Sequence, residues 1–184
     1  MNEIPTIPDW QISQWFNTPT PLTQAGMRGR VVLLHAFQML CPGCVSHSVP
    51  QAERVHREFA ESGVSVIGLH TVFEHHAAMT PIGLEAFLHE YRITHPVGVD
   101  QMTPGEPVPV TMRKYKLRGT PSLMLLDRAG HLRMHEFGRV DDLHLGVAIG
   151  RLLMEEKSMP DELQRQSERN GRTTNCDEQG CEVL

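Results

Sequence analysis

The stretch that decides the fold is Val31-Val32-Leu33-Leu34-His35-Ala36-Phe37, which is followed closely by Cys41-Pro42-Gly43-Cys44. An uninterrupted apolar run rich in valine and leucine predicts a buried strand, and the residues after Cys44 have the pattern of a helix. Two cysteines spaced C-x-x-C at a strand-to-helix turn are typical of a redox motif. At a helix start, unpaired N–H groups and the positive end of the helix dipole stabilise a thiolate on the first cysteine.

The same spacing could supply half of a zinc site, which needs four ligands, usually from a second C-x-x-C or a histidine pair. No second pair lies at zinc-ribbon spacing, so we expect redox chemistry, with no metal and no cofactor. Pro42 and Gly43 suit a tight turn that keeps the two sulfurs close enough to bond. The adjacent His75 and His76 should point apart, and we expect them to be surface or core residues.

Composition narrows the class of protein. The chain has 184 residues, of which 40% are hydrophobic, and a formal net charge of -5. No cluster of lysine and arginine predicts a nucleic-acid partner, and the apolar runs are too short to predict a membrane span. The N-terminus lacks the pattern of a secretory signal, so we expect a cytoplasmic protein, whose thiols are kept reduced. The four cysteines are then catalytic or sensing rather than structural.

The pattern of apolar residues predicts one domain over 1–157, including an N-terminal lead-in, and a polar, disordered tail over 158–184. Strands are expected over 31–37, 64–69, 95–100, 122–126 and 132–137, and helices over 44–62, 81–91, 110–115 and 141–156. Pro50 should kink the first helix. In the last helix we expect core contacts from Leu143, Val147, Leu152 and Leu153. Alternating strands and helices that end in a hairpin predict an α/β layered sheet.

This order of elements, together with Gly119-Thr120-Pro121-Ser122 and Leu125-Leu126-Asp127-Arg128-Ala129-Gly130, resembles the thioredoxin superfamily, and within it the TlpA-like or redoxin branch. The resemblance covers roughly Trp10 to Leu153. It implies a thioredoxin-like fold: a central mixed sheet with helices on both faces, and an extra helix and strand over 85–100.

The resemblance also implies a function, thiol–disulfide oxidoreductase. Cys41 would be the nucleophile and Cys44 the resolving cysteine, and Pro121 would be a cis-proline packed against the dithiol. Thr120, Pro42 and Gly43 would contact the substrate. The partners implied are a protein or small-molecule disulfide and a reducing system.

The sequence departs from the thioredoxin pattern around the motif, where Pro42-Gly43 reverses the usual Gly-Pro pair. Leu40 replaces the tryptophan that precedes the first cysteine, and His35 stands where thioredoxins carry a buried acidic residue. One hypothesis is that His35 carries the proton exchanged when Cys44 attacks a mixed disulfide, because imidazole titrates near neutral pH. The alternative is a core histidine satisfied by a backbone carbonyl.

Two further functions stay open. The segment from Cys44 to Pro50, with His47, is similar to the one after a peroxiredoxin's peroxidatic cysteine, which favours a thiol peroxidase with antioxidant activity. However, Phe37 and Cys41 occupy the positions of that family's proline and threonine. The other alternative is a non-catalytic redox sensor or metal-binding adaptor.

Cys176 and Cys181 lie far from the main motif, in the expected tail. They could form a second dithiol that exchanges electrons with the first, because a flexible arm of this length reaches it. They could instead contribute to a soft-metal site, or be exposed thiols without a role. Neighbouring acidic residues disfavour their thiolates.

Overall fold

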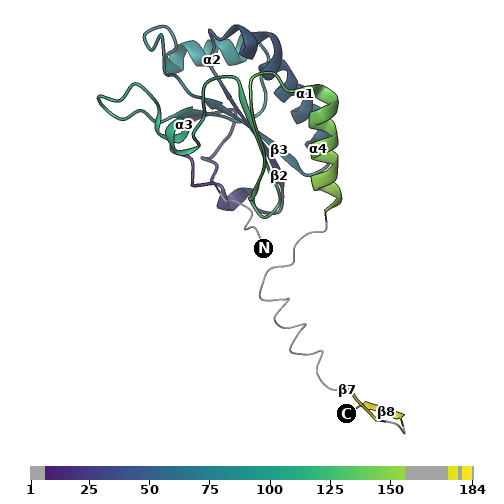
Figure 1. The fold of residues 1–184 in the computed structure, drawn as a ribbon. Helices are drawn as coiled ribbons and strands as arrows, with labels where there is room; N and C mark the ends of the chain where they lie inside the picture. The colour runs from purple at the N-terminus through teal and green to yellow at the C-terminus, as the bar shows by residue number, and fades with distance from the viewer. Residues whose placement is uncertain (1–6, 156–173, 178–179, 184) are drawn as a thin grey trace.

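In the computed structural model, the described residues are 7–155, with the backbone of 174–177 and 180–183 (Figure 1). The strands are β1 (Ile12–Phe16), β2 (Val31–Phe37), β3 (Val64–His70), β4 (Val97–Asp100), β5 (Ser122–Leu126), β6 (Leu132–Phe137), β7 (Thr174–Asp177) and β8 (Gly180–Val183). The α-helices are α1 (Val49–Phe59), α2 (Pro81–Glu90), α3 (Val110–Lys114) and α4 (Asp142–Met154). The strands expected over 31–37, 122–126 and 132–137 are confirmed to the residue.

Six strands form one mixed sheet in the order β1-β4-β3-β2-β5-β6. Strand β3 runs parallel to both β2 and β4, whereas β1, β5 and β6 are each antiparallel to their neighbours. The central strand β2 is buried along its whole length, which explains its uninterrupted apolar sequence. The loops after β2, β3 and β4 therefore meet at one edge of the sheet, the edge formed by the carboxyl ends of these parallel strands. The C-x-x-C motif lies at this edge.

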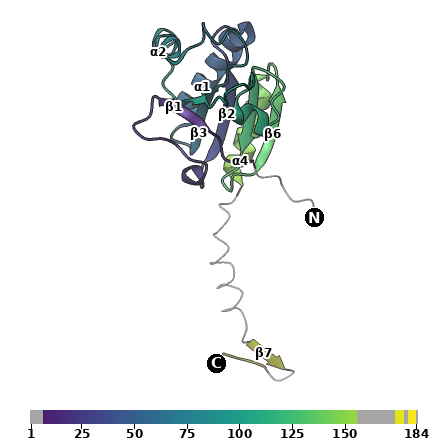
Figure 2. The ribbon, with the colours of Figure 1, turned by 90° about the vertical axis from the view of Figure 1, so that its left-hand side faces the viewer.

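Helices cover both faces of the sheet, as the resemblance implied (Figures 1 and 2). On one face, α1 and α4 pack over alternate residues of the strands, in a core that contains Val31, Leu33, Val64, Val66, Leu123 and Leu125. On the other face, α3 and the N-terminal segment pack over Val32, Leu34, Ile67 and Met124. A third cluster, at the edge that carries the motif, joins Phe37 and Cys44 to Leu84 and Leu88 of α2.

The lead-in contributes an element that the sequence analysis did not predict. Residues Ile12–Phe16 form β1, which pairs with β4 at the edge of the sheet. Trp10, just before it, is buried and donates its indole N–H to the carbonyl of Leu22 at 2.9 Å. The strand ends at Asn17, whose φ of 56° is incompatible with an extended chain.

Two of the four residues expected to make core contacts from the last helix do not make them. Leu152 is buried in α4, but Leu143 and Val147 are 80% and 53% exposed. The buried face of α4 is formed by Leu145, Ile149 and Leu152, which recur at steps of four and three residues. Leu143 and Val147 lie on the opposite side of this helix.

The first helix has an unusual turn directly before it, close to Pro50. Residues Cys44–Ser48 form a π-helical turn, and α1 starts immediately after it, with Pro50 in its first turn. Proline cannot donate a backbone hydrogen bond, and its ring collides with the carbonyl four residues earlier. A wider turn before Pro50 relieves that collision. The irregularity that the structure shows near Pro50 is thus a π turn, which carries Cys44.

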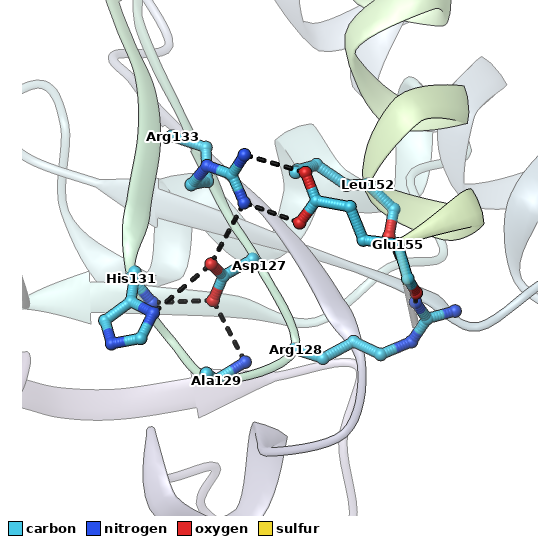
Figure 3. Close-up of polar contacts among 7 residues, drawn as sticks. All are labelled: Asp127, Arg128, Ala129, His131, Arg133, Leu152 and Glu155. Carbon is cyan, nitrogen blue, oxygen red and sulfur yellow. Dashed lines mark hydrogen bonds and ion pairs between the residues drawn. The ribbon is translucent and has the colours of Figure 1, made fainter. Parts of the chain in front are cut away.

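Hydrogen bonds from the β5–β6 turn attach the C-terminal end of α4 to the sheet (Figure 3). Asp127 accepts hydrogen bonds of 2.9 Å from the backbone N–H groups of Ala129 and His131, which shapes the turn. Arg128 donates to the carbonyls of Leu152, Leu153 and Glu155 at 2.9–3.1 Å. These are carbonyls at the helix C-terminus, where a cation also complements the helix dipole.

The expectation of a disordered tail over 158–184 falls mostly outside the described residues. Within it, β7 and β8 pair antiparallel as a two-stranded hairpin, an element that was not predicted. Among the described residues, no helix is both long and apolar enough to cross a membrane.

Candidate functional site

The two cysteines of the motif differ sharply in their exposure. Cys41 follows β2 after a short loop and is half-buried, whereas Cys44 opens the π turn and is fully buried. Both are free thiols. A reagent or a substrate disulfide can therefore reach Cys41 more readily than Cys44.

The start of the helix is directed at Cys41. The backbone N–H of Cys44 donates a hydrogen bond of 3.2 Å to the Cys41 sulfur. The Cys41 thiol in turn lies 3.5 Å from the carbonyl oxygen of Thr120. An N–H donor stabilises a thiolate on Cys41, because hydrogen bonds to the charged form favour that form.

The pKa of the Cys44 thiol is raised to about 12, first by burial and then by its hydrogen bond with the Cys41 side chain. At neutral pH, Cys44 is therefore protonated, and a protonated thiol is a poor nucleophile. The site thus contains one accessible sulfur that accepts an N–H hydrogen bond and one buried sulfur that keeps its proton.

The Thr120–Pro121 loop lies against the motif. Its peptide bond is cis. A Cβ placed on Gly43 would lie 3.4 Å from Cδ of Pro121, so the motif and the proline ring are in contact at this point. The structure thus brings Thr120 and Pro121 against the motif residues Cys41, Gly43 and Cys44, which lie far from them in the sequence.

Sequence reasoning missed Gln38, which ties the loops of this edge together. The side chain is buried, and its Oε1 accepts a hydrogen bond of 3.2 Å from the N–H of Phe73. Its Nε2 donates to Glu74 at 3.3 Å and to the Thr120 hydroxyl at 3.4 Å. A polar residue directly after a buried strand was the only available signal.

His35 is buried, but it does not make the hydrogen bond to a backbone carbonyl that was expected of a core histidine. Its Nε2 lies 2.9 Å from Nε2 of His95, rather than on a backbone carbonyl. Its Nδ1 has no hydrogen-bond partner among the described residues. Its ring stacks on Phe37, with centroids 5.2 Å apart. Burial, and then the neighbouring His95, hold the pKa of His35 well below its usual value.

The other histidines are distributed over the fold. The ring of His47 is held by a 2.8 Å hydrogen bond from its Nε2 to the carbonyl oxygen of Val140, on the α4 side. His75 and His76 are exposed on the loop after β3. Within the part of the chain that the structure describes, no three His, Cys, Asp or Glu residues are placed to hold a metal ion.

Cys176 and Cys181 are opposite each other in the register of β7 and β8. Directly opposed residues of an antiparallel pair have Cα atoms about 4.5–5.5 Å apart, and disulfides span a similar distance. The backbone therefore permits this pair to bond.

Comparison with solved structures shows what this chain is similar to. A thioredoxin-like superfamily protein is 59% identical over 82% of this chain and 97% of its own, with a TM-score of 0.79. A thiol-disulfide isomerase from Corynebacterium glutamicum is 48% identical over 85% of this chain and 100% of its own, with a TM-score of 0.80. A thioredoxin-like protein solved in its oxidised form shares the fold at 20% identity, with a TM-score of 0.69 over 84% of this chain and 99% of its own.

Other comparisons gave no match: no protein-family model fits the chain, and no curated protein is significantly similar to it.

Proposed function

The chain belongs to the thioredoxin-like superfamily, and on that premise we propose that it is a thiol–disulfide oxidoreductase that cycles Cys41 and Cys44 between dithiol and disulfide. The observation that carries the proposal is the asymmetry of the motif. Cys41 is accessible and its sulfur accepts the N–H of Cys44, whereas Cys44 is buried and its pKa is raised to about 12. The thiol-disulfide isomerase from Corynebacterium glutamicum, at 48% identity, supports the same class of chemistry.

In this mechanism the Cys41 thiolate attacks one sulfur of a substrate disulfide. The substrate's S–S bond breaks, its second sulfur leaves as a thiolate, and Cys41 is left in a mixed disulfide. Cys44 then loses its proton and attacks the Cys41 sulfur, which releases the first substrate sulfur and forms the Cys41–Cys44 bond. Two electrons pass from the dithiol to the substrate. A separate reducing system must return them.

The remaining residues have supporting roles. His35 exchanges the proton of Cys44. Thr120, Pro121, Pro42 and Gly43 form the surface on which the substrate disulfide lies, because the Thr120 carbonyl and the Pro121 ring both contact the motif. Leu40, next to the nucleophile, is 57% exposed and offers an apolar contact to a protein substrate.

Peroxidase activity through Cys44 is disfavoured by the same geometry. A peroxidatic cysteine must be an accessible thiolate, but Cys44 is fully buried and protonated at neutral pH. Arg118, the arginine nearest to Pro121 in sequence, lies over the Phe137 ring at 5.0 Å from its centroid.

The test compares wild type, Cys41→Ser and Cys44→Ser in the reduction of a disulfide-linked fluorescent peptide, with peroxide consumption measured in parallel. We expect both variants to lose multiple turnover, and no protein to consume peroxide. Peroxide consumption that needs Cys44 but survives the loss of Cys41 would replace this proposal with the peroxidase.

Two finer assignments stay predictions. A second dithiol at Cys176 and Cys181 is tested by tryptic mapping of the oxidised protein for a peptide that contains their disulfide. A cytoplasmic location is tested by fusing the chain to a reporter that folds only in a reducing compartment.

A further inference from the structure

Three buried side chains form a continuous chain of hydrogen bonds beneath the first helix. Glu53 of α1 lies 2.9 Å from Nδ1 of His95, and Nε2 of His95 lies 2.9 Å from Nε2 of His35 on β2. The three residues are 0–4% exposed. His35 shares its face of the sheet with Phe37, which packs in the same cluster as Cys44.

The Glu53 carboxylate, at one end of this series of hydrogen bonds, is held by further donors. Glu53 accepts hydrogen bonds from the Thr94 N–H at 3.0 Å and from the Thr94 hydroxyl at 2.7 Å, and the exposed Arg57 lies 3.5 Å away. Burial alone would raise the pKa of Glu53. The hydrogen bonds from His95 and Thr94 outweigh that effect and lower it to about 2. Glu53 is therefore ionised at neutral pH and can only accept protons.

If both histidines are neutral, this fixes which ring nitrogens carry the protons. Since Glu53 only accepts, the Nδ1 of His95 must carry a proton and donate it. A neutral His95 then has a lone pair on Nε2, which accepts the Nε2–H of His35. The Nδ1 of His35 is consequently unprotonated, and it is also the atom that has no hydrogen-bond partner among the described residues.

Other titratable groups near His35 leave this arrangement undisturbed. His70, which packs on Phe37 from β3, has its pKa lowered to about 4 by burial. His56 of α1 lies with its ring 5.9 Å from that of His95, and burial lowers its pKa as well. The charged Glu53 is linked to His35 through His95, and the exposed Arg57 lies beside Glu53. Gly68 on β3 has no side chain, and the rings of His35 and Phe37 lie against it.

We propose that Glu53, His95 and His35 form a proton relay for Cys44, an inference that rests on the function proposed above. As Cys44 attacks the Cys41 sulfur, its proton is transferred to Nδ1 of His35, an atom to which the Cys44 thiol makes no hydrogen bond before the attack. The proton on Nε2 of His35 then moves to Nε2 of His95. The positive charge then rests on His95 beside the Glu53 carboxylate. The Cys41–Cys44 bond forms, the bond from Cys41 to the substrate sulfur breaks, and the departing thiolate is protonated by solvent. Re-reduction of the disulfide reverses these shifts.

The relay explains how a fully buried histidine can accept a proton. A fully buried imidazole resists carrying a charge, so His35 in isolation is a poor proton acceptor. Moving the charge one ring further places it next to a carboxylate, where it is stabilised. His95 and Glu53 thus act through His35, as positioning residues.

The first test does not depend on turnover. Nitrogen NMR of the reduced wild-type protein, with labelled histidine, reports which ring nitrogen carries a proton. We expect His35 protonated at Nε2 and His95 protonated at Nδ1. The opposite tautomer on either ring would overturn the relay.

The second test separates the two chemical steps by rapid mixing with a small aromatic disulfide. In a Cys44→Ser background, Glu53→Gln should leave the rate of mixed-disulfide formation within about twofold, because Cys41 alone reacts. With Cys44 present, the same change should slow resolution by about tenfold or more. Glu155→Gln, in a surface ion pair, is the matched control and should change neither step.

The outcomes distinguish the relay from the function on which it rests. Equal slowing of both steps, or unchanged resolution, would refute the relay while the oxidoreductase stands. If Cys44→Ser protein forms no mixed disulfide at all, the proposed function fails and the relay fails with it, whatever the histidine tautomers.

Discussion

The backbone N–H of Cys44 points at the sulfur of Cys41, 3.2 Å away, while the Cys44 sulfur itself is fully buried. In the proposed mechanism, the main chain of Cys44 stabilises the nucleophile Cys41, and the Cys44 thiol keeps its own proton until the mixed disulfide has formed. The motif thus combines one accessible cysteine with one buried, protonated cysteine.

The first prediction concerns alkylation. At pH 7.5, iodoacetamide should modify Cys41 at least about tenfold faster than Cys44, since only the thiolate reacts and Cys44 holds its proton. Mass spectrometry of peptides from time-quenched samples of reduced protein measures both rates. Equal rates would contradict the structure, in which Cys44 is buried and its thiol keeps its proton.

A second prediction follows from the pKa of Cys44, which burial, and then the hydrogen bond with Cys41, raise from 9.0 to about 12. The unfolded chain loses this proton at lower pH than the folded protein does. The free energy of unfolding of the reduced protein should therefore fall as pH rises from about 9 to about 12, by up to about 1.4 kcal/mol per pH unit.

Urea titrations at several pH values measure this dependence. Cys44→Ala is the control, because it removes the titrating group and should show a shallower slope over the same pH range. Parallel slopes for the two proteins would contradict the assignment.

The third prediction concerns Gly68 on β3. A Cβ there would lie 2.9 Å from Cγ2 of Val97 and 3.2 Å from Nε2 of His35. Gly68→Ala should therefore destabilise the protein by about 1–3 kcal/mol, because crowding in a packed core forces side chains apart. Denaturant unfolding measures the loss.

Gly146→Ala is the matched control for that substitution. A Cβ at Gly146, within α4, meets nothing within 4 Å, and alanine favours a helix over glycine by up to about 1 kcal/mol. This variant should be as stable as the wild type or more so. Similar losses in both variants would show that the space around Gly68 is not the cause.

The fourth prediction tests the attachment of α4 to the β5–β6 turn (Figure 3). Arg128→Ala removes the donor to three carbonyls at the end of this helix, and should cost about 1–2 kcal/mol. Arg151→Ala, on an exposed part of the same helix, should cost less. Thermal and urea unfolding of both variants gives the comparison, and equal effects would remove the special role of Arg128.

The sequence predicted the parts of the fold that depend on local patterns. The strands over 31–37, 122–126 and 132–137 were found with their bounds because each is a compact segment set off by turn residues. Strand β1 was missed, since Ile12–Phe16 mixes polar and apolar residues among prolines, and its pairing with β4 is long-range.

The site was predicted less completely, for a related reason. The motif and the Thr120–Pro121 dipeptide can be recognised from sequence alone. His95 could not be, because its partners Glu53 and His35 lie 42 and 60 residues away in the chain, and only the packing of α1 on the sheet brings them together. Gln38 was missed in the same way.

The measurement that tests the central claim most directly is the trapping of a mixed disulfide on Cys44→Ser protein. With a peptide disulfide as substrate and the reaction quenched by acid, mass spectrometry should find one peptide per protein, attached to Cys41. In the wild type the same reaction should end in a Cys41–Cys44 disulfide with no attached peptide. A peptide attached to any other cysteine of the variant, with Cys41 free, would contradict the assignment of Cys41 as the nucleophile.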